Sequence, residues 1–333
     1  MATTLIKDTV RTYFRGIGQV MFQQSAWTGL LFLAGIFWGA YEADMPQVAW
    51  GAVVGAFLGV VGGYILDEDP SDGAAGLWGF NGVLVGCALP TFLGNTWLMW
   101  VCLIFGSLLS TWFRQAFNNL IAPAKVSSFT FPFVFTTWVF LLCAGILHGL
   151  DGSGLSKPEM AETFTYTLDT DFGHLVVYWL KGIAQVFLID SWITGIFFIA
   201  ALAVCSRWAA FWAMAASAIS LALAILFKAD PADIASGLFG FSPVLTGIAL
   251  GCTFYKPNWK SALWTVAGVA ATFFIQAAMD VLMKNWGVPT LTAPFCIATW
   301  LFLWPQYKLG NSKVTEKTAW TEFTASVGDD PKK

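Results

Sequence analysis

The chain has 333 residues, of which 57% are hydrophobic and only 11% are charged, and its mean hydropathy is +0.67. Soluble domains carry about 25% charged residues, so this composition excludes an ordinary soluble enzyme and a disordered chain, and the formal net charge of −3 excludes a nucleic-acid-binding protein. A surface so poor in charge needs lipid around it. We therefore predict an all-α polytopic membrane protein.

Apolar runs separated by charges or by Pro and Gly clusters are the predicted membrane spans, since a helix needs about 20 apolar residues to cross a bilayer. They cover residues 17–41, 47–66, 76–93, 97–114, 129–148, 175–204, 208–227, 237–254, 262–283 and 290–305. The basic segment before the first run predicts a short interfacial helix. The resulting domains are a first five-span repeat at 1–148, an extracytoplasmic linker at 149–173, a second five-span repeat at 174–309 and a polar cytoplasmic tail at 310–333.

The basic residues fall mostly on one side of this arrangement. With the N-terminus in the cytoplasm and the spans alternating, 13 of the 17 Lys and Arg residues lie on the cytoplasmic side. Cytoplasmic loops are enriched in these residues, so both termini are predicted to be cytoplasmic.

Three motifs of the first half recur in the second half. Residues 15–22 recur at 181–188, residues 76–84 at 237–245 and residues 130–133 at 292–295, with offsets of 166, 161 and 162. Because each repeat has an odd number of spans, the second must cross the membrane in the opposite sense. This predicts two inverted-topology repeats with the transport path at their interface. The Gly- and Pro-containing motifs also predict broken helices and pore-facing turns.

Two carboxylates lie within the predicted spans. Asp280 precedes Lys284 by four residues, a spacing that favours a helical ion pair. Asp190 lies deeper and is the group that could couple transport to protons, although its counterpart in the first repeat is the neutral Gln24.

The repeated motifs themselves contribute only amide, hydroxyl, aromatic and aliphatic side chains. This chemistry favours a small, uncharged, planar solute that donates hydrogen bonds. An ion would find no fixed charge to replace its lost hydration. Two alternatives stay open: a facilitator for another small neutral solute, such as ammonia or a short amide, and a proton-coupled carrier that uses Asp190.

Neither an enzyme nor a metalloprotein is expected. The six cysteines stand singly, no Cys/His cluster occurs, and the HExxH and GxSxG motifs are absent from the sequence. We predict no catalytic residue, no metal and no cofactor.

The paired motifs resemble those of the urea transporters, a family of urea channels, over residues 12–305. The resemblance implies a bacterial member in the inner (plasma) membrane, a homotrimer with one pore per protomer, and a half-length pore helix in each repeat. It further implies passive facilitated diffusion of urea through a narrow slot without coupling ions.

The resemblance also implies which positions line the slot. Phe22, Phe80 and Phe241 match the slot aromatics, and Gln19 and Gln185 match polar positions near the two entrances. The positions matching the central constriction and its hydrogen-bond-accepting ladder are Val20, Leu84, Thr130, Val186, Leu245 and Thr292. Two positions depart from the pattern: Leu188 stands where the first repeat has Phe22, and Gln185 stands where an acidic residue occurs in some bacterial relatives.

Overall fold

A computed structural model describes residues 2–157 and 166–309, with side chains from residue 8 onward. The described residues form helices, turns and irregular segments, with no β-strand among them. Contacts divide the chain into two compact units, which meet in the sequence at Leu155 and Ser156. Each unit is described by itself.

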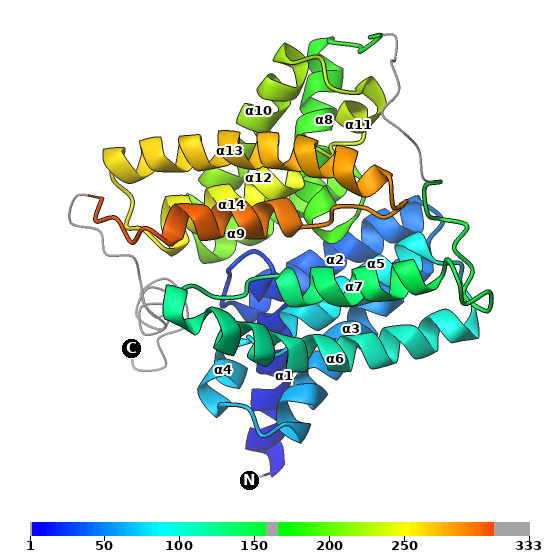
Figure 1. The fold of residues 1–333 in the computed structure, drawn as a ribbon. Helices are drawn as coiled ribbons and strands as arrows, with labels where there is room; N and C mark the ends of the chain where they lie inside the picture. Colours follow the sequence, from blue (N-terminus) through cyan, green and yellow to red (C-terminus); the bar gives the residue numbers. More distant parts are fainter. Residues whose placement is uncertain (1, 158–165, 310–333) are drawn as a thin grey trace. The chain divides into compact units, whose positions relative to one another are not determined.

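The first unit contains seven α-helices in its described part (Figure 1): α1 (Ala2–Gln19), α2 (Ala26–Glu42), α3 (Pro46–Ile65), α4 (Pro70–Ala75), α5 (Phe80–Phe92), α6 (Trp97–Ile121) and α7 (Phe131–Cys143). A 3-10 turn, η1 (Ala122–Ala124), follows α6. Helices α3 and α6 are long and apolar enough to cross a membrane. Helices α5 and α7 have 13 residues each and reach only about 20 Å, less than the hydrocarbon thickness of about 30 Å.

The second unit repeats this order of helices: α8 (Phe172–Ala184), α9 (Trp192–Cys205), α10 (Arg207–Leu226), α11 (Pro231–Ala235), α12 (Phe241–Ile248), α13 (Trp259–Lys284) and α14 (Ala293–Leu303). A 3-10 turn, η2 (Gln185–Phe187), extends α8, and a π-helical turn, η3 (Ala249–Thr253), extends α12. Helices α10 and α13 can cross a membrane, and the short α14 packs along α13 (Figure 1). Each unit has two short apolar helices of this kind, and the predicted half-length pore helix of each repeat stays a prediction.

The two units share local backbone features at corresponding positions. Helices α4 and α11 both begin with an Asp-Pro pair, in which the aspartate caps the helix and the proline is its first residue. Both are followed by a glycine in the left-handed region, Gly76 at φ 86° and Gly237 at φ 73°, a conformation that L side chains rarely adopt. The internal repeat is thus visible in the local structure of both units.

The first and sixth predicted spans are not continuous helices, which corrects the sequence prediction. Helix α1 runs through the predicted interfacial segment and ends at Gln19, and α2 begins only at Ala26. The cause is a helix cap: Phe22 is left-handed at φ 63°, and the Gln23 amide donates to Gly18 O at 3.0 Å, the closing pattern of a Schellman motif. In the sixth span, α8 with η2 and α9 meet at an angle of 71°.

Helices α3 and α5 approach so closely that their backbones touch. A Cβ atom on Gly51 would overlap the carbonyl oxygen of Gly86, and a Cβ atom on Gly55 would overlap that of Gly82. In the second unit the position of Gly51 is Trp212 of α10, whose indole lies against Gly251 of η3. In each unit, the packing surface of the long helix is therefore complementary to that of the short helix in the same unit.

Candidate pore residues

Three helix ends carry the predicted pore residues of the first unit. Gln19 ends α1, Phe80 begins α5, and Thr130 is the N-cap residue of α7. The α5 helix packs against both α1 and α7. The remaining predicted residues of this unit lie in the turn after α1 or one turn into α5, and all six are buried: Gln19, Val20, Phe22, Phe80, Leu84 and Thr130.

The corresponding helix ends carry the predicted residues of the second unit. Gln185 and Val186 lie in η2, Phe241 begins α12, and Thr292 is the N-cap residue of α14. The α12 helix packs against α8, η2 and α14. Val186, Leu245 and Thr292 are buried, while Gln185, Leu188 and Phe241 are partly exposed.

Both glutamine side chains are fixed by a backbone carbonyl. Gln19 Nε2 donates to Ala75 O at 2.7 Å, and Gln185 Nε2 donates to Ser236 O at 2.9 Å. Since a carbonyl oxygen can only accept, these bonds decide which end of each carboxamide faces the backbone. The Oε1 atom of Gln19 is buried and has no hydrogen-bond partner in the part of the chain that the structure describes. It is available to accept.

The turn after each glutamine uses a left-handed residue that is not glycine. Phe22 has φ 63° and Leu188 has φ 60°. The Phe22 ring makes an edge contact with Phe129, with 6.2 Å between ring centroids, and Phe129 is itself left-handed at φ 50°. Strained non-glycine residues of this kind persist only where their surroundings hold them, and they cluster here beside the predicted pore residues.

Helices α7 and α14 begin at their threonine N-cap residues without a side-chain cap from them. Thr130 and Thr292 have nearly the same backbone angles, φ −89° and ψ 8° against φ −88° and ψ 15°. In the first unit, Oδ1 of Asn81 in α5 accepts from the Phe133 amide at 3.1 Å. This bond ties the beginning of α7 to the beginning of α5.

A buried ionic cluster holds the segment before α5. Arg114 of α6 donates to Glu68 Oε2 at 2.9 Å and to Asp72 Oδ2 at 2.5 Å, and all three side chains are nearly inaccessible. On its other side, α4 offers Ala74 O to Arg15 and Ala75 O to Gln19. In the second unit, the residue at the position of Arg114 is Gln276, which donates to Leu238 O at 2.5 Å. Among the described residues, charged side chains therefore hold the segment before α5, whereas neutral glutamine side chains hold the segment before α12.

The two carboxylates singled out in the sequence are placed differently than expected. Asp190 Oδ1 lies 2.7 Å from Lys181 Nζ, and the Asp190 side chain is 46% exposed, so it is not a deeply buried group. Asp280 accepts a hydrogen bond from Thr290 at 2.7 Å, and no ion pair with Lys284 occurs among the described residues. Thr290, in the loop before α14, is therefore the partner of Asp280 in place of the expected Lys284.

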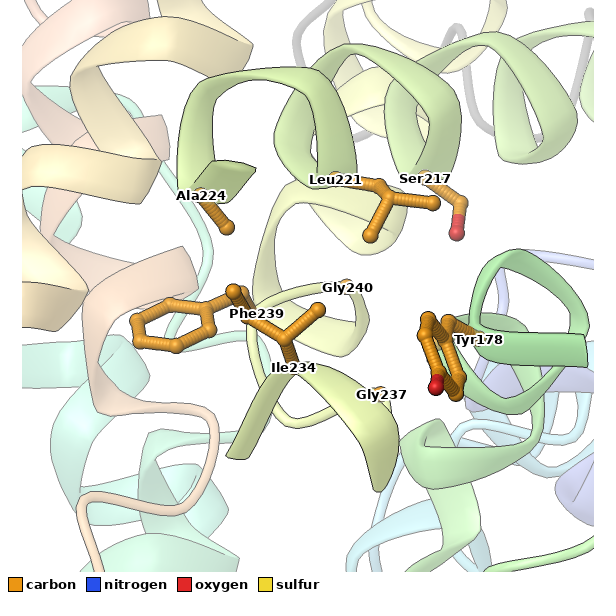
Figure 2. Close-up of a pocket in the computed structure, with 9 residues that line it drawn as sticks. Tyr178, Ser217, Leu221, Ala224, Ile234, Gly237, Phe239 and Gly240 are labelled. Atoms are coloured by element: carbon orange, nitrogen blue, oxygen red, sulfur yellow. The ribbon is translucent and has the colours of Figure 1, made fainter. Parts of the chain in front are cut away.

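One small pocket lies in the second unit, apart from the predicted pore residues (Figure 2). It lies between α8, α10 and the turn before α12. Tyr178 lies on one side, and Ser217 and Leu221 of α10 lie on another. The rest of the lining consists of Gly182, Ala224, Ile234, Gly237, Phe239 and Gly240. None of the twelve predicted residues lines it. It is apolar and offers no cluster of polar groups for a solute.

Comparison with known proteins decides the family. The profile of the family described as "Urea transporter" matches residues 10–307. The chain belongs to this family. Urea transporter 1 of Ovis aries is 29% identical over 311 residues, which are 90% of this chain and 79% of the sheep protein. Urea transporter 1 of Rattus norvegicus is 29% identical over 310 residues, with the same shares, and that of Mus musculus is 28% identical over 310 residues.

Membership in the urea transporter family confirms the predictions of a multi-pass membrane protein and of urea transport, and places the chain among transport proteins, not enzymes. The predicted pore residues stay predictions. So do the inverted topology, the trimer, the bacterial inner membrane and the cytoplasmic termini.

Three positions that organise the candidate site of this urea transporter family member are not among the residues predicted from the sequence. Asn81 lies inside a motif that was recognised, but only the neighbouring Phe80 was selected. Arg114 and Asp72 could not be predicted, because the members of this ionic cluster lie far apart in the chain and show no characteristic spacing. One signal was present: the Asp-Pro pairs at 69–70 and 230–231 recur with the same offset of 161 as the glycine-rich motif and mark the short helices α4 and α11.

Proposed function

We propose that this chain conducts urea passively through a narrow, uncharged slot to which both of its repeats contribute residues. The slot-lining residues are the twelve selected from the sequence: Gln19, Val20, Phe22, Phe80, Leu84, Thr130, Gln185, Val186, Leu188, Phe241, Leu245 and Thr292. Urea is small, planar and neutral, with N–H groups that donate and a carbonyl oxygen that accepts.

One observation carries this proposal. In each unit a glutamine has its NH₂ group bound to a backbone carbonyl, Ala75 O or Ser236 O. The carboxamide oxygen is then the end that remains to meet a solute, and it accepts from N–H groups. An acceptor at each entrance suits urea, which must replace its hydrogen bonds to water as it enters, at a cost of about 1–3 kcal/mol for each polar group left unpaired.

The other helix ends add complementary groups. Phe80 and Phe241 occupy the first position of α5 and α12, where flat apolar walls admit a planar solute. Thr130 and Thr292 occupy the N-cap positions of α7 and α14, where their hydroxyl oxygens accept urea N–H groups. The amino ends of these four helices carry partial positive charge, which disfavours cations such as ammonium and sodium.

The proposed architecture is an inverted pair of five-span repeats with both termini in the cytoplasm. It is supported by the repeated order of helices and by the distribution of Lys and Arg. We further propose a homotrimer with one pore per protomer, in the inner membrane of a bacterium.

The proton-coupled alternative is disfavoured by the surroundings of Asp190. A coupling carboxylate has to exchange its proton within the transport path, but Asp190 is ion-paired with Lys181 and half exposed. The ammonia alternative has no support from histidine, because His174 is paired with an exposed Asp169 at 3.0 Å and His148 lies on an exposed turn.

Stopped-flow permeability measurements on proteoliposomes test the proposed function. Urea, thiourea, ammonia and water are compared in the same vesicles, with and without a pH gradient. We expect rapid urea flux that stops at equal concentrations and is indifferent to the gradient. Accumulation of urea above the external concentration would contradict passive transport, and equal rates for urea and thiourea would contradict a narrow slot.

A further inference from the structure

The residue two positions before each N-cap threonine is held by a side chain of the long helix that precedes it. In the first unit, the Ser128 amide donates to Oδ1 of Asn118 in α6 at 2.8 Å. In the second unit, the Thr290 hydroxyl donates to Oδ1 of Asp280 in α13 at 2.7 Å. The two acceptors are 162 residues apart, which is also the offset of the repeated Thr-x-Pro-Phe motif. Corresponding residues therefore hold corresponding loops.

The held residue is joined to the first turn of the short helix through its own carbonyl group. Ser128 O accepts from the Phe131 amide at 3.0 Å, and Thr290 O accepts from the Ala293 amide at 3.2 Å. Phe131 and Ala293 are the first residues of α7 and α14, so their amides are among the donors that find no acceptor within their own helix. In each unit a chain of two hydrogen bonds thus runs from the long helix to the beginning of the short helix.

The residue between the held position and the N-cap threonine has the same unusual conformation in both units. Phe129 has φ 50° and Leu291 has φ 51°, and a left-handed non-glycine residue persists only where its surroundings hold it. The bonds at Ser128 and Thr290 provide such a hold directly before it. The first unit uses a backbone donor for this bond and the second unit uses a side-chain donor, so the two units share the constraint although they differ in its chemistry.

We propose that Asn118 and Asp280 are positioning residues for urea transport, each of which fixes the loop that brings the N-cap threonine of its unit to the slot. This inference rests on the proposed function, in which Thr130 and Thr292 line the slot. Asn118 and Asp280 act through these threonines and do not themselves contact the solute.

The different donors of the two units lead to opposite expectations for the held residues. Ser128 donates with its backbone, and its buried hydroxyl has no hydrogen-bond partner among the described residues, so Ser128→Ala keeps the bond to Asn118. Thr290 donates with its hydroxyl, so Thr290→Val breaks the bond to Asp280 and Thr290→Ser keeps it. We expect Ser128→Ala and Thr290→Ser to retain urea permeability within about twofold. Thr290→Val should lower it about threefold to tenfold, the range of one hydrogen bond.

A double-mutant cycle in the second unit tests the inference by measuring the urea permeability of the full chain in proteoliposomes. Asp280→Ala removes the acceptor and should lower urea permeability as much as Thr290→Val does. The double variant should be no slower than either single variant, because both changes break the same bond. Asp280→Asn keeps an acceptor oxygen and should retain permeability within about twofold. If Asp280→Ala does not assemble, Thr290→Val and Thr290→Ser test the same bond from its donor.

The first unit offers a matched control at the next residue of α6. Asn118→Ala should lower urea permeability about threefold to tenfold, and Asn118→Asp, which keeps an acceptor oxygen, should retain it within about twofold. Asn119 is exposed, and its Oδ1 accepts from Gln115 of the same helix at 3.4 Å. Asn119→Ala should therefore leave urea permeability unchanged.

Two further measurements separate positioning from a general loss of active protein. Fewer active copies would lower urea and thiourea permeability in the same proportion, whereas a displaced threonine should lower the ratio of urea to thiourea permeability. Thr290→Val should also have a smaller effect when Thr292→Val is already present, because the hydroxyl that it positions is gone.

The results that would overturn the inference are distinguishable from a failure of the proposed function. Unchanged urea permeability in Thr290→Val, a proportional fall for urea and thiourea, or multiplicative effects of Thr290→Val and Thr292→Val would each show that Asp280 does not act through Thr292. If Thr292→Val itself lowers urea permeability, the proposed slot would stand in all three cases. Unchanged urea permeability in Thr292→Val would remove this threonine from the slot, and the proposed function would lose that part together with the inference.

Discussion

Phe22 and Leu188 occupy corresponding turns and share the same left-handed backbone conformation, with φ angles of 63° and 60°. The two units therefore differ at this position in the side chain and not in the path of the chain. Because the first unit already holds a phenylalanine in this conformation, the second unit should accept one without new backbone strain.

Leu188→Phe is accordingly expected to fold and to sharpen selectivity. An added aromatic wall is worth about 0.5–1.5 kcal/mol, so the ratio of urea to thiourea permeability should rise roughly twofold to tenfold. The measurement is stopped-flow flux of both solutes in the same vesicles. Leu226→Phe, at an end of α10 where the side chain is 71% exposed, is the control and should change nothing. An unchanged ratio in Leu188→Phe would place this residue outside the slot.

The two N-cap threonines are expected to act together on urea. Thr130→Val combined with Thr292→Val removes two acceptors, and at about 1 kcal/mol each the urea permeability should fall roughly tenfold to thirtyfold. Circular dichroism checks that the helices remain. Thr136→Val is the control, since the Thr136 hydroxyl is buried in α7 but donates only to Pro132 O within that helix, at 2.7 Å. Full urea flux in the double variant would contradict a hydroxyl ladder.

The aromatic residues at the beginnings of α5 and α12 are expected to exclude larger solutes. Phe80→Ala or Phe241→Ala removes a wall, so thiourea and short amides should permeate more rapidly relative to urea. Permeability ratios from the same vesicle preparations provide the measurement. Phe105→Ala, at a position that is 56% exposed on α6, serves as the control. Retained discrimination in both alanine variants would argue against aromatic walls.

The ion pair of Asp190 and Lys181 is expected to contribute little to transport or stability. Its side chains are 46% and 22% exposed, so Asp190→Asn should cost less than about 1 kcal/mol of unfolding free energy. Urea flux should keep the same dependence on pH as in the parent. Loss of the pH dependence on this substitution would restore the proton-coupled alternative.

Replacing the corresponding aspartates of α4 and α11 by asparagine is expected to change the stability of the protein in opposite directions. Asp72 is bound to the buried Arg114, and Asp72→Asn should destabilise the protein by roughly 1–3 kcal/mol. In α11, outside the long spanning helices, burial raises the pKa of Asp233 above 3.8, Asp230 raises it further, and Lys284 partly opposes this. Protonation of Asp233 therefore stabilises the folded protein. This contribution is complete below the ordinary pKa of the unfolded chain and is lost as the pH rises through the raised pKa of the folded protein.

Asp233→Asn should therefore raise the melting temperature in detergent at pH 8, with the gain disappearing toward pH 4. Asp72→Asn should lower the melting temperature at pH 8. A lower melting temperature for Asp233→Asn at pH 8 would show that a partner stabilises the ionised form of Asp233.

Much of the fold could be predicted from apolar runs and repeats, and the family from six short motifs. The long helices α3 and α10 begin and end within one residue of the predicted spans at 47–66 and 208–227, because their apolar runs end at charged or turn-forming residues. The break between α1 and α2 could not be predicted in this way. It depends on a left-handed phenylalanine within an apolar run, where no glycine or proline marks the turn.

The residues of the candidate site also fall into two groups, those that the sequence alone predicts and those that it does not. Residues that repeat, such as Gln19 and Gln185, could be selected by comparing the halves of one sequence. Residues that do not repeat could not, since Asn81 corresponds to Ser242 and Arg114 to Gln276. Their contacts join helices that are far apart in the chain, and neither the hydrophobic pattern nor the internal repeat of the sequence predicts such contacts.

The backbone contact between α3 and α5 limits how the halves can be recombined. Gly51 and Gly55 lie against Gly86 and Gly82, where a Cβ atom would overlap the facing backbone, while Trp212 at the position of Gly51 lies against Gly251. A chimaera that moves α10 alone into the place of α3 would drive an indole into the α5 backbone. Chimaeras that move the long and short helices together keep each surface with its match. For anyone who builds a symmetric pore from one half of this chain, the smallest exchangeable piece is therefore a pair of helices.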